Sequence, residues 1–199
     1  MTTRTAARLG AASGIAYVVA LMAASSTGGD STAALAAELV PMLLFFPFLA
    51  YLWSVLRDAE GPGGWLSATA LSTGVAAVTI KLGSAGPAVA ARHDGLSPAL
   101  HDALQQVNDV SFIVTMLPLG VCMGSVAAIV LRTHAMPAWL GWMAAVLAPL
   151  LIANGLALNS QEGPAFLLFL LWILLAAIVL LRRTIVVPQH APTATGVIA

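Results

Sequence analysis

Five polar residues lie inside or directly before long apolar segments, where ionisable groups are rare and usually functional. Lys81 interrupts an otherwise uncharged apolar run, and Glu38 and Asp109 each stand at the start of one. Ionisable groups inside lipid are costly, so they usually face a bundle interior, a partner or water. Titrating acids beside a buried cation are suited to ligand binding, proton exchange or general-acid catalysis. The candidate site residues are Glu38 and Asp109 as titrating or catalytic acids, and Lys81, Asn108 and Asn154 as ligand-binding groups.

Helix geometry predicts that these residues lie at one depth. At a rise of 1.5 Å per residue, Lys81 and Asn154 lie about 24 Å from the cytoplasmic ends of their helices. This is the outer third of a hydrocarbon core about 30 Å thick. Glu38 and Asp109 begin their helices at the outer boundary, so we predict an outward-facing polar pocket with Lys81 paired to one of these acids. Alternatively, Lys81 reaches to the outer headgroups and the two acids cap their helices.

The two acids have different sequence surroundings. Glu38 is flanked by Ala37 and Leu39, whereas Asp109 follows the polar stretch 105–108. We therefore expect Glu38 to exchange protons and Asp109 to stay ionised as the counter-ion of Lys81.

Six apolar segments are long enough to position these residues. A membrane-spanning helix needs about 20 largely apolar residues, and lipid tolerates only helices or closed barrels. The sequence therefore predicts an all-α integral membrane bundle of six transmembrane helices, forming a single domain over residues 1–183 and followed by a tail at 184–199. The predicted helices are Leu9–Thr27, Leu39–Leu56, Trp65–Ala91, Val110–Leu131, Ala138–Leu158 and Ala165–Leu181.

The composition excludes several functional classes. The 199 residues include 8 Lys and Arg and 8 Asp and Glu, which is 8% charged residues, against about 25% in soluble domains. This excludes a soluble enzyme, and the absence of a basic run excludes a nucleic-acid partner. A single cysteine, Cys122, excludes an internal disulfide. The sequence predicts neither a metal nor a cofactor, and it leaves a lipophilic or cationic ligand and self-association open.

The arginines predict the orientation. With the N-terminus in the cytoplasm, six arginines fall inside and only Arg92 falls outside, as the positive-inside rule requires. We therefore expect a multi-pass protein of the cell membrane with both termini in the cytoplasm. The inner arginines are Arg4, Arg8, Arg57, Arg132, Arg182 and Arg183.

The second and third segments align with the fourth and fifth. Glu38 precedes Pro47 by nine residues and Asp109 precedes Pro118 by nine, and Arg57 corresponds to Arg132. This pattern suggests a tandem hairpin repeat. The alternative is that arginine, proline and tryptophan mark membrane interfaces in any multi-pass protein.

Smaller motifs indicate local structure. Ser97 and Pro98 are suited to the N-cap and first position of a helix, so the fourth helix should begin about three turns outside the bilayer. The pairs Gly10/Gly14 and Gly120/Gly124 are typical of close helix packing.

Two segments carry a resemblance to a known family. Residues 51–57, after Glu38, read YLWSVLR, and residues 131–142 read LRTHAMPAWLGW. With these the chain resembles, over residues 10–183, small actinobacterial multi-pass membrane proteins grouped only as a domain of unknown function. The sequence departs from that family at Ala138, where arginine is usual, and in its third helix, where a Gly-Tyr…Phe-Arg pattern is missing. The resemblance implies six helices and no particular activity.

Three functions follow from these residues. The first is small-molecule binding or proton- or cation-coupled transport at the outward-facing pocket. The second is a cofactor-free intramembrane enzyme that uses Glu38 or Asp109 as general acid on a lipidic or terpenoid substrate. The third is an accessory protein without a site of its own.

Overall fold

The computed structural model describes residues 3–25, 32–91, 95–157 and 164–186, and in these residues all regular secondary structure is helical. The helices are α1 (Thr3–Ser25), α2 (Thr32–Glu60), α3 (Leu66–Ala90), α4 (Pro98–Thr133), α5 (Ala138–Ala157) and α6 (Pro164–Val186). The predicted all-α bundle is therefore confirmed. The tail is predicted to begin at residue 184, but α6 continues to Val186. The part of the tail from 187 onward lies outside the described residues.

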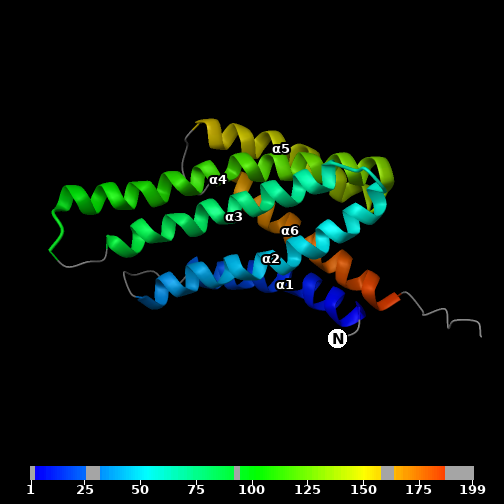
Figure 1. Ribbon diagram of the computed structural model, residues 1–199, viewed down its shortest axis with the longest axis horizontal. Coiled ribbons are helices and arrows are strands. Elements are labelled where there is room, and N and C mark those ends of the chain that lie inside the picture. The colour runs from blue at the N-terminus through cyan, green and yellow to red at the C-terminus, as the bar shows by residue number, and fades with distance from the viewer. Residues whose placement is uncertain (1–2, 26–31, 92–94, 158–163, 187–199) are drawn as a thin grey trace, which may run out of the picture.

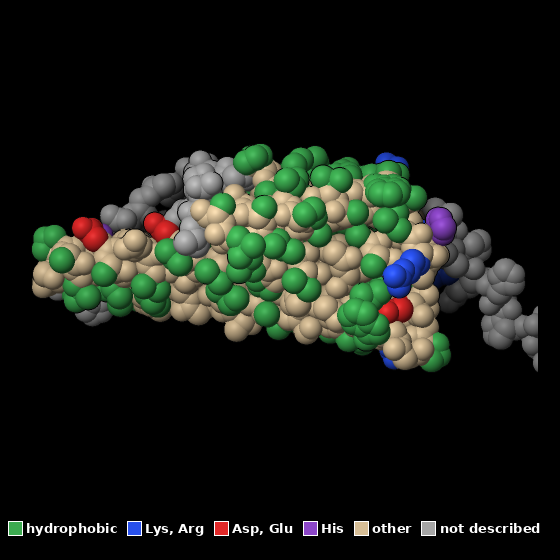
Figure 2. Space-filling view, turned by 90° about the horizontal axis from the view of Figure 1, so that it is seen from above, with side chains coloured by type: hydrophobic (Ala, Val, Ile, Leu, Met, Phe, Trp, Pro, Cys, Tyr) green, Lys and Arg blue, Asp and Glu red, His purple; other side chains and the backbone are tan. Residues whose placement is uncertain are grey.

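All six helices are long and apolar enough to cross a membrane. The protein is thus a multi-pass membrane protein whose outer helix faces contact the lipid bilayer. Figure 2 shows hydrophobic side chains over the middle of one face, with charged side chains toward the two ends.

The helices form two groups of three. In one, α3 packs on α4 and α4 on α5; in the other, α1 packs on α2 and on α6. Contacts of α2 with α3 and α5 with α6 join the groups. Figure 1 shows the helices running along the long axis, with α1 beginning at the same end as α2, α4 and α6 finish.

Helix α4 is the longest element and begins as the sequence predicts. The Ser97 side chain accepts a hydrogen bond from the Leu100 N–H at 3.4 Å, and Pro98 occupies the first turn. The 36 residues of α4 extend about 54 Å, which exceeds the thickness of a bilayer core of about 30 Å. In Figure 1 its N-terminal part projects beyond α5.

Two charged side chains fix the turn between α2 and α3. The Glu60 carboxylate accepts hydrogen bonds from the backbone N–H groups of Leu66 (3.0 Å) and Ser67 (2.9 Å). Arg57 donates to the Gly64 carbonyl at 2.9 Å. The first N–H groups of a helix have no partner within the helix, so Glu60 caps α3 from across the turn.

Three glycines of the two predicted pairs, Gly10, Gly14 and Gly120, allow close helix packing, whereas a Cβ at Gly124 would lie at an ordinary 3.7 Å from Ala148 Cβ. A Cβ at Gly10 or Gly14 would approach α2 side chains to 2.6 Å and 2.5 Å. A Cβ at Gly120 would lie 2.5 Å from Ile152 Cγ1 and 2.9 Å from the Ala148 carbonyl oxygen on α5. The Gly10 and Gly14 contacts therefore set the separation of α1 and α2, and the Gly120 contacts set that of α4 and α5. A larger residue would change these separations.

We expect Gly120→Ala to lower the free energy of unfolding by about 1–2 kcal/mol, because overpacking a close contact costs about 1–3 kcal/mol. Gly83→Ala is the matched control, since its Cβ would meet nothing within 4 Å and alanine favours a helix. Reversible unfolding in detergent measures both. Equal stability of the two variants would contradict the close α4–α5 contact.

Candidate ligand-binding site

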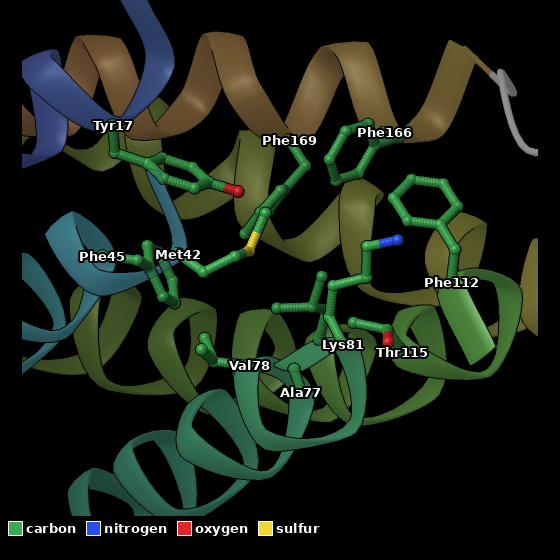
Figure 3. Close-up of a pocket in the computed structure, with 11 residues that line it drawn as sticks. Tyr17, Met42, Phe45, Ala77, Val78, Lys81, Phe112, Thr115, Phe166 and Phe169 are labelled. Carbon is green, nitrogen blue, oxygen red and sulfur yellow. The ribbon is translucent and has the colours of Figure 1, made fainter. Parts of the chain in front are cut away.

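A cavity lined by five helices lies between the two groups (Figure 3). It offers about 30 Å³ to the centre of a water-sized sphere, within a wider hollow of about 340 Å³ that includes its opening to the outside. The inner space is large enough for a few waters, at about 10–15 Å³ each, or for a small polar head group. Its lining residues are Tyr17 of α1, Met42 and Phe45 of α2, Ala77, Val78 and Lys81 of α3, Phe112, Thr115 and Leu119 of α4, and Phe166 and Phe169 of α6.

Lys81 provides the charged group of this cavity's described lining. Its side chain is only 7% exposed, and its ammonium donates a hydrogen bond to Asn108 Oδ1 at 3.1 Å. The ammonium also lies 5.7 Å from the centre of the Phe112 ring, within range of a cation–π interaction. In Figure 3 it points toward Phe112 and Phe166. Lys81 therefore lies inside the bundle and does not reach out to the lipid headgroups.

A small polar network orients Asn108. Its Oδ1 also lies 3.1 Å from the Ser84 hydroxyl, and that hydroxyl lies 2.7 Å from the Lys81 carbonyl oxygen. A hydroxyl has one hydrogen, so Ser84 donates to one of these two oxygens at a time. Two donors beside Oδ1 fix the direction of the Asn108 amide toward Lys81.

The structure describes the side chain of only one of the two candidate acids, Asp109. The half-buried Asp109 carboxylate forms no ion pair or hydrogen bond with any residue that the structure describes. The neighbouring amide, Asn108, is the group that contacts Lys81 from α4. The Glu38 side chain lies outside the described residues, so its pairing with Lys81 stays a prediction.

Asn154 lies in a different contact from the one predicted. Its Nδ2 donates to the Met116 sulfur, and Gly155 beside it packs against Leu117 of α4. Asn154 thus belongs to the α4–α5 contact and is absent from the described cavity lining. Of the four predicted residues whose side chains the structure describes, Lys81 and Asn108 are brought together.

Aromatic rings make up much of the remaining wall. Tyr17 and Phe45 have ring centres 5.1 Å apart, and Phe45 lies 6.4 Å from Phe169. Phe112 of α4 meets Phe166 of α6 edge to face at 4.9 Å. Edge-to-face and tilted pairs at these distances are favourable, so these rings form a nearly continuous apolar surface from α1 to α4.

Sequence reasoning missed the aromatic residues, although a signal was present. Asn108, Phe112, Thr115 and Leu119 are spaced by four, three and four residues, which places them on one face of α4. The lining of α4 could therefore have been derived from Asn108. No comparable spacing connects Tyr17 or Phe169 with a charged residue.

The fold and the cavity together define a class: a six-helix multi-pass membrane protein with an aromatic cavity and a buried lysine inside the bundle. Comparison with protein-family models, curated proteins and solved structures gives no match. The resemblance to actinobacterial membrane proteins therefore stays a prediction. Within the described residues, no group of three His, Cys, Asp or Glu side chains could hold a metal ion.

Proposed function

We propose that the protein binds a small lipophilic molecule inside the membrane, with an acceptor oxygen of that molecule on the Lys81 ammonium. The observation that carries this proposal is the position of Lys81, 7% exposed in the wall of an aromatic cavity. Ligand sites typically combine mainly apolar walls with few polar groups that fix orientation. An ammonium has three N–H donors, so donation to a ligand can accompany its contacts with the protein.

The charge of Lys81 favours an acceptor over a cation. Aromatic walls can bind a cation, but Lys81 already places one 5.7 Å from the Phe112 ring. A second cation would compete with the Lys81 ammonium for this ring. A carbonyl or carboxylate oxygen can instead accept a hydrogen bond from an ammonium.

Transport and general-acid catalysis would need an acid that takes part in the site. Glu38 is the candidate, and its side chain lies outside the described residues. Asp109 makes no described contact with Lys81. Binding is therefore the function that the described geometry supports best.

We further propose that the end of the bundle at which α1 begins faces the cytoplasm. Arg57, Arg132 and Arg183 lie in the last turns of α2, α4 and α6, which finish at that end (Figure 1). The positive-inside rule supports this orientation. The cavity then lies in the outer part of the membrane.

The test compares two probes in protein-containing lipid nanodiscs. Undecanophenone carries one carbonyl oxygen, and undecylbenzene is its counterpart without oxygen. We expect the ketone to bind more tightly and Lys81→Met to weaken ketone binding about 10- to 100-fold, because a hydrogen bond to a charged group contributes about 1.5–3 kcal/mol. Binding is measured by equilibrium titration at matched mole fractions in the bilayer.

The matched control is Thr79→Met, which places the same side chain at an exposed position of α3 and should leave ketone binding unchanged. Equal affinity of the wild type for ketone and hydrocarbon, or unchanged ketone binding in Lys81→Met, would contradict the proposal.

A further inference from the structure

The Tyr17 hydroxyl faces the cavity and has no hydrogen-bond partner among the residues that the structure describes. Tyr17 is 4% exposed, and Figure 3 shows its oxygen pointing into the cavity, toward Phe169. Within the described ranges, the hydroxyl makes no hydrogen bond to a side chain or backbone group. Its ring is held in place by Phe45, with the ring centres 5.1 Å apart.

Tyr17 lies deep in the helix bundle. Tyr17 lies 14 residues after the start of α1, about 21 Å along the helix, whereas interfacial tyrosines lie near the membrane surface. Tyrosines buried at such a depth usually have a hydrogen-bond partner. The Tyr17 hydroxyl faces the cavity (Figure 3), so a group that enters the cavity is the natural acceptor.

Two donors thus face one cavity from different helices, the Tyr17 hydroxyl from α1 and the Lys81 ammonium from α3. The Thr115 hydroxyl is not a third, because it donates to the Ser111 carbonyl of its own helix at 2.8 Å. The other lining residues are apolar. A ligand that contacts both groups would do so best with two acceptors on an otherwise apolar body.

We infer that the ligand carries two acceptor oxygens, one bound by Lys81 and the other by the Tyr17 hydroxyl. This inference rests on the proposed function and makes its ligand class more specific. Two kinds of membrane-soluble molecule share this chemistry. A fatty acid carries both oxygens on one small head, which suits the narrow inner space of about 30 Å³. A quinone carries them across a flat ring that can lie against Phe45 and Phe169 and needs the wider hollow.

The test uses Tyr17→Phe, which removes only the hydroxyl. Three probes are titrated into nanodiscs: palmitate, 2-decyl-1,4-benzoquinone and the one-oxygen ketone undecanophenone. We expect Tyr17→Phe to lower the affinity for a two-oxygen probe about 5- to 10-fold, which corresponds to the loss of one neutral hydrogen bond. The affinity for the ketone should change less than about twofold. Whether palmitate or the quinone responds identifies the source of the two oxygens.

Two controls separate a ligand contact from a structural role. Tyr51→Phe makes the same change at the α1–α2 contact, outside the described lining, and should alter no affinity. The melting temperature of ligand-free Tyr17→Phe should equal or exceed that of the wild type. A lower melting temperature would overturn the inference, because the hydroxyl would then stabilise the protein itself.

The outcomes also distinguish this inference from the proposed function. If Lys81→Met weakens binding of the two-oxygen probes but Tyr17→Phe does not, the two-oxygen inference is overturned and the proposed function stands. If Lys81→Met weakens no probe, the proposed function fails.

Discussion

Asn108→Leu should lower the free energy of unfolding by about 2 kcal/mol. Leucine has nearly the shape of asparagine but cannot accept the hydrogen bond that Lys81 donates at 3.1 Å, or the one that the Ser84 hydroxyl at 3.1 Å can donate. Hydrogen bonds to charged groups contribute about 1.5–3 kcal/mol, and a buried charge that loses an acceptor keeps its desolvation cost. Reversible unfolding in mixed micelles measures the loss.

Asp109→Asn is the matched control for this prediction. It changes the next residue of α4, whose carboxylate has no bonded partner among the described side chains, so stability should change by less than about 0.5 kcal/mol. The double variant Lys81→Met/Asn108→Leu should lose less stability than the two single losses added together, because both partners are then apolar. A large loss in Asp109→Asn with none in Asn108→Leu would instead make Asp109 the counter-ion.

Accessibility to a membrane-impermeant maleimide should differ completely between the two ends of α4. Ala99 and Thr133 are exposed residues near its first and last turns. In a Cys122→Ala background, we expect Ala99→Cys to be labelled on intact cells and Thr133→Cys only after permeabilisation. The reason is the arginine at the end of α4, Arg132, which the positive-inside rule places in the cytoplasm.

The background variant serves as the control, since it has no cysteine and should take up no label. The opposite labelling pattern would reverse the orientation and place the cavity in the inner part of the membrane. Labelling of both positions on intact cells would contradict a membrane crossing between them.

The fold was largely predictable because its determinants are local. The length of an apolar run decides whether a helix can span a membrane, and this requirement needs no knowledge of neighbours. The start of α4 was equally local, since Ser97 and Pro98 act within one turn. Helix ends differed more where polar residues continue the helix beyond the apolar run, as in α2, which extends to Glu60.

The site was only partly predictable. The sequence gives the depth of a residue along its helix, but it does not give the direction in which the side chain points around the helix axis. Lys81 and Asn108 were expected at one level, and they do meet. Asn154 was expected at the same level, but it faces Met116 in the α4–α5 contact. The rotation of each helix depends on packing such as that of Gly120, and this packing is set by all the helices together.

The spread of the cavity wall along the chain has a consequence for biosynthesis. The turn between α2 and α3 is closed by Arg57 and Glu60 through bonds to residues six or seven positions away, so it can form as soon as that hairpin leaves the ribosome. The cavity wall, by contrast, runs from Tyr17 to Phe169. A nascent chain therefore holds an incomplete wall until its last helix enters the membrane, and ligand binding is a property that the protein gains only at the end of its assembly.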